Sequence, residues 1–259
     1  MSIWGKIIGG AAGFALGGPL GALLGALAGH AADRYAETDA PALTGPEGAG
    51  TAGSAGGDDR AATKQIAFTI AVIALGAKIA KVDGQVSRSE VAAFKEVFQV
   101  PANETANVAR VFDLAKRDAR GFESYAKQIA KMFRKDHPVL EELLEGLFHI
   151  AKADGQIHDA ELAYLAEVAR LFGFSEADFA RMREANLGPD KADPYTVLGV
   201  RREMTNDEIR AAWRQLVRDN HPDRLFAQGL PEEFVNLANQ KLATINAAYD
   251  KVAKERGII

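Results

Sequence analysis

The most distinctive polar residues of this 259-residue chain lie near its C-terminus, where His221, Pro222 and Asp223 are consecutive. Arginines precede and follow this tripeptide, at positions Arg210, Arg214, Arg218 and Arg224. The first three are spaced four apart, so on a helix they form one basic stripe that leads into the tripeptide. Proline stiffens the turn, and an exposed cationic face steers association with a protein partner. These features are consistent with a protein-binding surface, but the bare tripeptide recurs by chance and each arginine taken singly fits a solvated helix face. We expect no catalytic residue among them.

A second set of polar residues belongs to an internal repeat. The segment Ala80–Val86 (AKVDGQV) returns 71 residues later as Ala151–Ile157 (AKADGQI), and a glutamate follows each copy at the same offset. The carboxylates are hard oxygen ligands that suit Ca²⁺ or Mg²⁺ if the two copies meet in space. Each also has a local role, because Asp caps its turn and Glu caps the next helix. We favour the local roles and expect no cofactor and no resident metal. The candidate ligands are Asp83, Glu90, Asp154 and Glu161.

Composition excludes several classes of protein. A content of 47% hydrophobic and 25% charged residues is typical of a globular protein, and the net charge of −4 argues against a nucleic-acid binder. The chain has no cysteine, which excludes disulfides and Cys-ligated zinc. No Ser/His/Asp arrangement or Gly-rich phosphate loop is visible, and the other histidines are scattered. We therefore expect that the protein is not an enzyme.

Two amphipathic helices are predicted to position the tripeptide. Thr205 and Glu208 form a capping box that starts a helix over residues 205–219. Its apolar sector consists of Ile209, Ala212, Trp213, Leu216 and Val217. A second helix opens at 231–233, and we expect its inward residues to pack against the first helix as an antiparallel hairpin. These residues are Phe234, Leu237, Leu242, Ile245, Tyr249 and Val252.

These segments together resemble a J-domain. Asp193–Val200 (DPYTVLGV) is similar to the opening of that family, and Lys241–Tyr249 (KLATINAAY) is similar to its ending. The resemblance implies that the tripeptide acts on the ATPase of a DnaK-type chaperone and that the four arginines meet an acidic surface on it. Three residues depart from the family pattern, and the last two of them weaken the basic face: Trp213, Gln215 and Asp219.

Residues 62–186 predict an all-α domain of about seven helices. Apolar residues recur at helical spacing in seven stretches separated by breaks at Gly and Pro. The stretches are Ile66–Ile79, Val91–Phe98, Val108–Leu114, Tyr125–Phe133, Leu140–Ile150, Leu162–Phe172 and Phe179–Met182. The paired Asp-Gly-Gln turns within this frame resemble the TerB-like fold.

Residues 1–34 predict a membrane-anchoring segment. The 23 residues Ile7–Gly29 carry no charged side chain, and as a helix they reach about 34 Å, enough to span a bilayer core. Glycines recur every fourth residue and form a candidate homodimer seam, because small residues let two helices approach closely. The seam consists of Gly9, Gly13, Gly17, Gly21 and Gly25. An interfacial or re-entrant hairpin and a cleaved signal peptide are alternatives.

Linkers separate the three folded parts. Residues 35–61 are rich in Gly, Ala and Pro and predict a flexible linker, and residues 187–192 form a shorter one before the J-domain at 193–259. The order of a glycine-patterned segment, a TerB-like domain and a C-terminal J-domain resembles the DjlA-like membrane-anchored J-proteins of Gram-negative bacteria. The stretch Asp223–Pro231 is similar to that group as well.

This second resemblance implies a co-chaperone at the bacterial inner membrane that serves an unknown client. Positive charges lie at both ends of the anchor and do not decide its orientation. Because DnaK and ATP are cytoplasmic, we expect a single-pass protein whose soluble part faces the cytoplasm. The alternative function is an envelope-stress or divalent-metal sensor, or scaffold, whose TerB-like domain controls the output of the J-domain.

Overall fold

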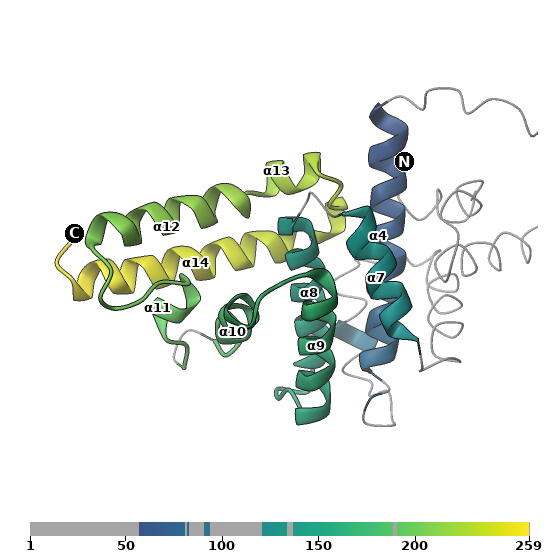
Figure 1. Ribbon diagram of the computed structural model, residues 1–259, viewed down its shortest axis with the longest axis horizontal. Helices are drawn as coiled ribbons and strands as arrows, with labels where there is room; N and C mark the ends of the chain where they lie inside the picture. The colour runs from purple at the N-terminus through teal and green to yellow at the C-terminus, as the bar shows by residue number, and fades with distance from the viewer. Residues whose placement is uncertain are drawn as a thin grey trace, which may run out of the picture.

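The computed structural model describes residues 57–80, 82, 91–93, 121–133, 137–188 and 191–258. Across these ranges the regular structure is helical and contains no strand, which confirms the predicted all-α class. The elements are α4 (Gly57–Ile79), α7 (Phe122–Met132), α8 (His137–Ala151), α9 (Asp159–Phe172), α10 (Glu176–Ala185), α11 (Pro194–Val197), α12 (Asn206–Asp219), α13 (Pro222–Ala227), η2 (Glu232–Phe234) and α14 (Val235–Glu255). In Figure 1, α4, α7, α8 and α9 stand side by side, and the hairpin of α12 and α14 runs crosswise to them.

The central group of helices is built around α8. All its side chains from Val139 to Phe148 are buried, and α4 is likewise buried from Phe68 to its end at Ile79. A helix buried on every side needs neighbours on every side, and α8 contacts α4, α9 and α14. Together these helices enclose one large apolar cluster, which we call the central core.

The C-terminal hairpin forms as predicted from Thr205 onward. The Thr205 backbone N–H donates to the Glu208 carboxylate at 2.7 Å, and the Glu208 N–H donates to the Thr205 hydroxyl at 3.3 Å, so the capping box is confirmed. Trp213 of α12 stacks on Tyr249 of α14 with ring centroids 4.1 Å apart. The indole N–H of Trp213 donates to Asn246 at 2.9 Å. These contacts close a second cluster, the C-terminal core, to which Ile245 and its neighbours belong.

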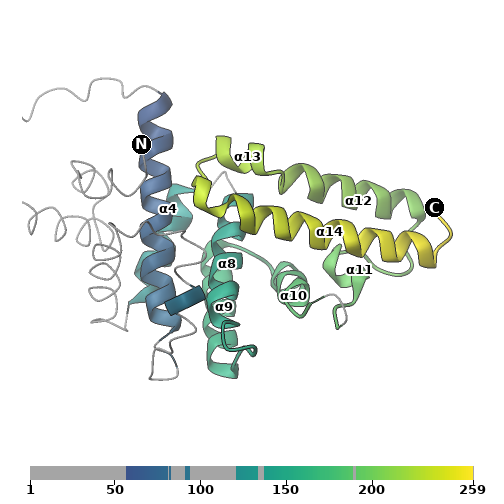
Figure 2. The same cartoon turned by 180° about the vertical axis from the view of Figure 1, so that it is seen from behind.

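The prediction that Phe234 and Leu237 pack against α12 is wrong. Phe234 is fully buried in the central core and Leu237 packs against that core, whereas Leu242 belongs to neither cluster. The reason is length. The 21 residues of α14 extend about 32 Å, but the 14 residues of α12 extend only about 21 Å. The N-terminal part of α14 therefore projects beyond α12 and reaches α8, as both views show (Figures 1 and 2).

Several predictions fall outside the described residues or at their edge. The glycine seam and the membrane segment lie in residues 1–56, and most of the stretches predicted to be helical at 91–98 and 108–114 also lie outside. The helix α4 begins at Gly57, inside the segment 35–61 that composition predicts to be a linker. Within the described ranges, no helix combines the length and the apolar character needed to cross a membrane.

Candidate functional site

The tripeptide forms a stiff, exposed turn between α12 and α13. His221 is the N-cap of α13, and its Nδ1 accepts a hydrogen bond from the Asp223 backbone N–H at 3.3 Å. Pro222 occupies the first turn of this helix, where its missing N–H leaves no bond unmade. The preceding residue, Asn220, is buried and donates through its side-chain amide to the Leu216 carbonyl at 2.8 Å. The side chains of His221 and Asp223 remain 51% and 93% exposed and are free to meet a partner.

Polar contacts on α12 organise the arginines near the tripeptide. Arg218 donates to the side-chain oxygen Oε1 of Gln215 at 2.6 Å, and the side-chain amide Nε2 of Gln215 donates to the Asp219 carboxylate at 2.6 Å. Arg224 binds the other oxygen of Asp219 at 2.6 Å. The two residues that depart from the usual basic pattern therefore hold two arginines in place beside the turn. Sequence reasoning treated Gln215 and Asp219 only as losses of positive charge and missed this role.

The remaining two arginines of the predicted stripe differ in their surroundings. Arg210 pairs with Asp207 across one helical turn, with the Nη1 to Oδ1 distance 3.2 Å. Arg214 is exposed and forms no ion pair with the described part of the chain. Exposed pairs such as the first contribute at most about 1 kcal/mol. The stripe therefore presents its positive charge to solvent along α12, although Asp219 neutralises part of it near the tripeptide.

The chain from α13 to η2 packs against the central group of helices. Leu225 and Leu230 are fully buried, and both belong to the central core rather than to the C-terminal core. Phe234 joins them, with its ring edge-on to Phe68 of α4 at a centroid distance of 4.8 Å. The tripeptide turn is thus supported from two sides, by its own hairpin and by the central core. The periodicity of the sequence gave no sign of this arrangement, because it shows which residues are buried but not against what.

A buried charged cluster joins the two domains further along α14. Lys241 places its ammonium 2.7 Å from Glu141 and 2.7 Å from Glu142 of α8. Arg181 of α10 pairs with Glu141 at 2.8 Å, and Glu145 accepts a hydrogen bond from Asn186 at 2.7 Å. We call these residues the carboxylate cluster. It holds three carboxylates against the cations of α10 and α14 in the interior, where an unpaired charge is very costly.

Burial and pairing separate the pKa values of the three carboxyl groups. Burial alone would raise the pKa of Glu141, but Lys241 and Arg181 outweigh it and lower this pKa to about 2. Burial raises the pKa of Glu142 to about 7, against the attraction of Lys241. Burial also raises the pKa of Glu145. The cluster therefore favours a charged Glu141 and disfavours negative charge on Glu142 and Glu145.

The raised pKa of Glu142 predicts a pH-dependent stability. In the folded protein Glu142 keeps its proton between about pH 4.5 and about pH 7, where the unfolded chain releases it. Its stabilising contribution is fully present below pH 4.5 and is lost as the pH rises through about 7. Urea unfolding across this range should show a free energy that falls more steeply with pH in the wild type than in Glu142→Gln. Glu176→Gln, an exposed control, should keep the wild-type slope, and equal slopes for all three proteins would contradict the assignment.

The described carboxylates of the internal repeat serve the turns in which they lie. Asp154 accepts from the Gln156 backbone N–H at 3.1 Å and lies 3.2 Å from the His158 ring, and its pKa is lowered first by that backbone hydrogen bond. Glu161 accepts from the His158 backbone N–H at 2.8 Å. Asp83 and Glu90 lie outside the described residues. Within the described ranges, no group of three or more His, Cys, Asp or Glu side chains is arranged so that it could hold a metal ion.

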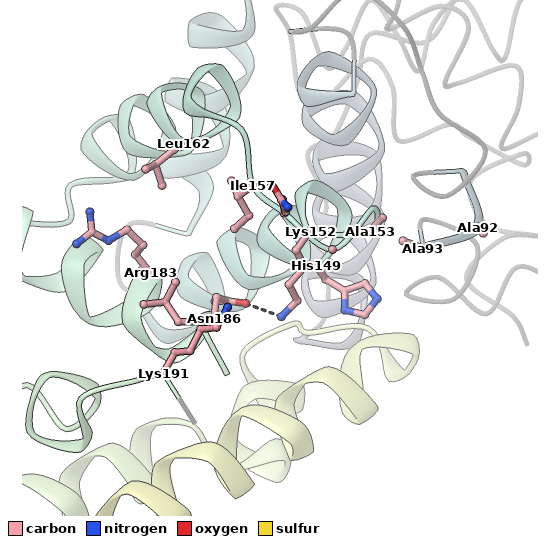
Figure 3. A pocket seen from close by; sticks show the side chains of 13 residues that line it. Ala92, Ala93, His149, Lys152, Ala153, Ile157, Leu162, Arg183, Asn186 and Lys191 are labelled. Atoms are coloured by element: carbon pink, nitrogen blue, oxygen red, sulfur yellow. Dashed lines mark hydrogen bonds between the residues drawn. The ribbon is translucent and has the colours of Figure 1, made fainter. Parts of the chain in front are cut away.

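A cavity of about 840 Å³ opens next to this second turn (Figure 3). Its described lining comes from the C-terminal ends of α8 and α10, the turn before α9 and the segment 91–93. This lining includes Lys152, Arg183 and Lys191 but no carboxylate. The Lys152 ammonium donates to the Asn186 side chain at 2.8 Å, the contact drawn in Figure 3.

Comparisons with known proteins match the chain along most of its length. The family model described as co-chaperone DjlA transmembrane domain matches residues 1–57, tellurite resistance protein TerB matches 69–184, and the DnaJ domain matches 193–256. The chain is 31% identical over 220 residues to co-chaperone protein DjlA of Photobacterium profundum, which covers 75% of this chain and 79% of that protein. It is 29% identical over 239 residues to co-chaperone protein DjlA of Vibrio cholerae, covering 80% and 84%. No solved structure matches the chain.

The order of the three matches follows the order of the parts described above, with the tripeptide and its arginines inside the DnaJ domain. The chain belongs to the family of co-chaperone protein DjlA, with a TerB domain at its centre and a J-domain at its C-terminus.

Proposed function

We propose that this co-chaperone stimulates the ATPase of a DnaK-type chaperone at the bacterial inner membrane. The observation that carries the proposal is the exposed His221–Asp223 turn, which lies at the end of a helix with an arginine stripe, inside a DnaJ domain. The J-domain docks on the ATP-bound chaperone and promotes hydrolysis, and so locks a client protein on that chaperone. The J-protein itself supplies no catalytic residue.

The geometry of the turn supports this role in two ways. The hydrogen bond from the Asp223 backbone to His221 and the proline between them hold the turn in one conformation before binding, which lowers the entropic cost of binding. The arginines of α12 present positive charge beside it, which raises the rate of encounter with an acidic surface and makes that rate sensitive to salt.

The membrane part of the proposal is supported by the match of residues 1–57 to a transmembrane-domain model. We propose that residues 7–29 cross the membrane once and that the rest of the chain faces the cytoplasm, where DnaK and ATP are found. The glycines of that segment, from Gly9 to Gly25, are proposed to form a homodimer seam, because glycine lets two helix backbones pack closely.

The packing of the chain after the tripeptide into the central core supports a regulatory role for the TerB domain. Because Leu225, Leu230 and Phe234 lie in the central core, a ligand or client that shifts this core also shifts the turn. The TerB domain is in this way suited to control the output of the J-domain. The described carboxylates of the repeat are engaged in local hydrogen bonds and give no support to a metal-sensing version of this role.

The decisive experiment is a steady-state ATPase assay of the DnaK-type chaperone with the full-length chain. The wild type is expected to stimulate hydrolysis, and His221→Gln is expected to abolish the stimulation, because glutamine removes the ring that caps α13 and faces the partner. His158→Gln is a matched control, since its ring is 53% exposed and lies in the TerB domain. No stimulation by the wild type, or equal stimulation by His221→Gln, would show the proposal to be wrong.

A further inference from the structure

The short helix α13 exposes an aromatic side chain close to the tripeptide. Phe226 is 42% exposed. Within the described ranges four large apolar residues are exposed, and Phe226 is the aromatic residue among them. Its neighbour Leu225 is fully buried in the central core. Consecutive residues of a helix point about 100° apart. Because the central core holds Leu225, it fixes α13 in an orientation that keeps Phe226 turned toward solvent.

Phe226 shares a helix face with the tripeptide. It lies four residues after Pro222, so the two side chains are neighbours one turn apart, and Pro222 is itself half-buried. The neighbouring side chains of Asp223 and Arg224 are exposed and charged. An aromatic residue surrounded by charged groups is the usual composition of a binding hot spot and its rim.

We propose that Phe226 is an apolar anchor for the DnaK-type chaperone and extends the contact surface of the tripeptide by one helical turn. The inference rests on the proposed function. A partner that touches His221, Pro222 and Asp223 lies directly over the adjoining turn of α13, and so it covers Phe226 as well. The TerB domain contributes to recognition indirectly, because its core sets the direction in which this side chain points.

The test is a titration of the chaperone ATPase with the full-length chain. In Phe226→Ala, the concentration that gives half-maximal stimulation is expected to rise about ten-fold, while the maximal stimulation stays unchanged. Phe226→Leu, which retains most of the apolar surface, is expected to stay within about two-fold of the wild type. Leu187→Ala removes a large side chain that is 47% exposed at the end of α10, and it is expected to have no effect.

Each other outcome has a definite meaning. If the wild type stimulates the ATPase and Phe226→Ala has the same half-maximal concentration, the anchor is disproved while the proposed function stands. If the wild type gives no stimulation, the proposed function fails and the anchor fails with it. A lowered melting temperature of Phe226→Ala, or a change in its sedimentation, would assign Phe226 to the fold or to contacts between copies and would overturn the proposal.

Discussion

Replacing Lys241 by methionine is expected to lower the free energy of unfolding by about 3–5 kcal/mol. The Lys241 ammonium is buried and lies 2.7 Å from both Glu141 and Glu142, which belong to a helix 99 residues earlier in the chain. Removing the cation leaves two carboxyl groups in the interior without their shared partner. Glu141 retains Arg181 at 2.8 Å, so most of the loss falls on Glu142 and on its neighbour Glu145.

Equilibrium urea unfolding measures this loss, and two variants isolate its cause. Lys254→Met changes an exposed lysine on the same helix and is expected to cost at most about 1 kcal/mol. Combining Lys241→Met with Glu142→Leu is expected to recover most of the stability, because an apolar pair of similar volume avoids the desolvation of a buried charge. A single variant Lys241→Met that unfolds like Lys254→Met would show that the cluster contributes little to joining the two domains.

The carboxylate cluster could have been predicted from the sequence, from charged residues that lie at buried positions of apolar helices. The helix α8 is apolar enough to be buried on every side, yet it carries Glu141, Glu142 and Glu145 within five residues. Lys241 lies on the buried face of α14, three residues after Ala238 and four before Ile245. Charged residues are almost never fully buried unless they are paired. Acidic residues on one buried helix and a lysine on the buried face of another therefore predict an ion pair between the two helices.

Local patterns predicted local structure well. The Thr205–Glu208 capping box, the end of α12 before Pro222 and the burial of Tyr249 all depend on residues a few positions apart, and the structure has each of them. The partner of the N-terminal part of α14 depends instead on the relative lengths of two helices and on the position of a third. A helical pattern cannot contain that information, because the same apolar face packs equally well against α12 or α8.

Truncating Phe234 to alanine is expected to destabilise both domains together, by about 3–5 kcal/mol. The ring is fully buried between Phe68 of α4 and the backbone of α8, where a Cβ added at Gly146 would come within 3.2 Å of it. The surrounding helices are tightly packed, so the cavity left by the ring cannot easily collapse. Since α14 also forms one half of the C-terminal hairpin, loosening this end of the helix lowers the stability of the hairpin as well.

Tryptophan fluorescence separates the two domains in this experiment. Trp213 lies in the C-terminal core and stacks on Tyr249, and the only other tryptophan, Trp4, is removed by Trp4→Phe. In that background Phe234→Ala is expected to shift the Trp213 transition and the circular-dichroism transition by the same amount, as one cooperative unit requires. The control Phe226→Ala removes an exposed ring and should leave both transitions in place. A Trp213 transition that stays fixed while circular dichroism shifts would mean that the J-domain folds independently of the TerB domain, and that the central core does not hold the His221–Asp223 turn.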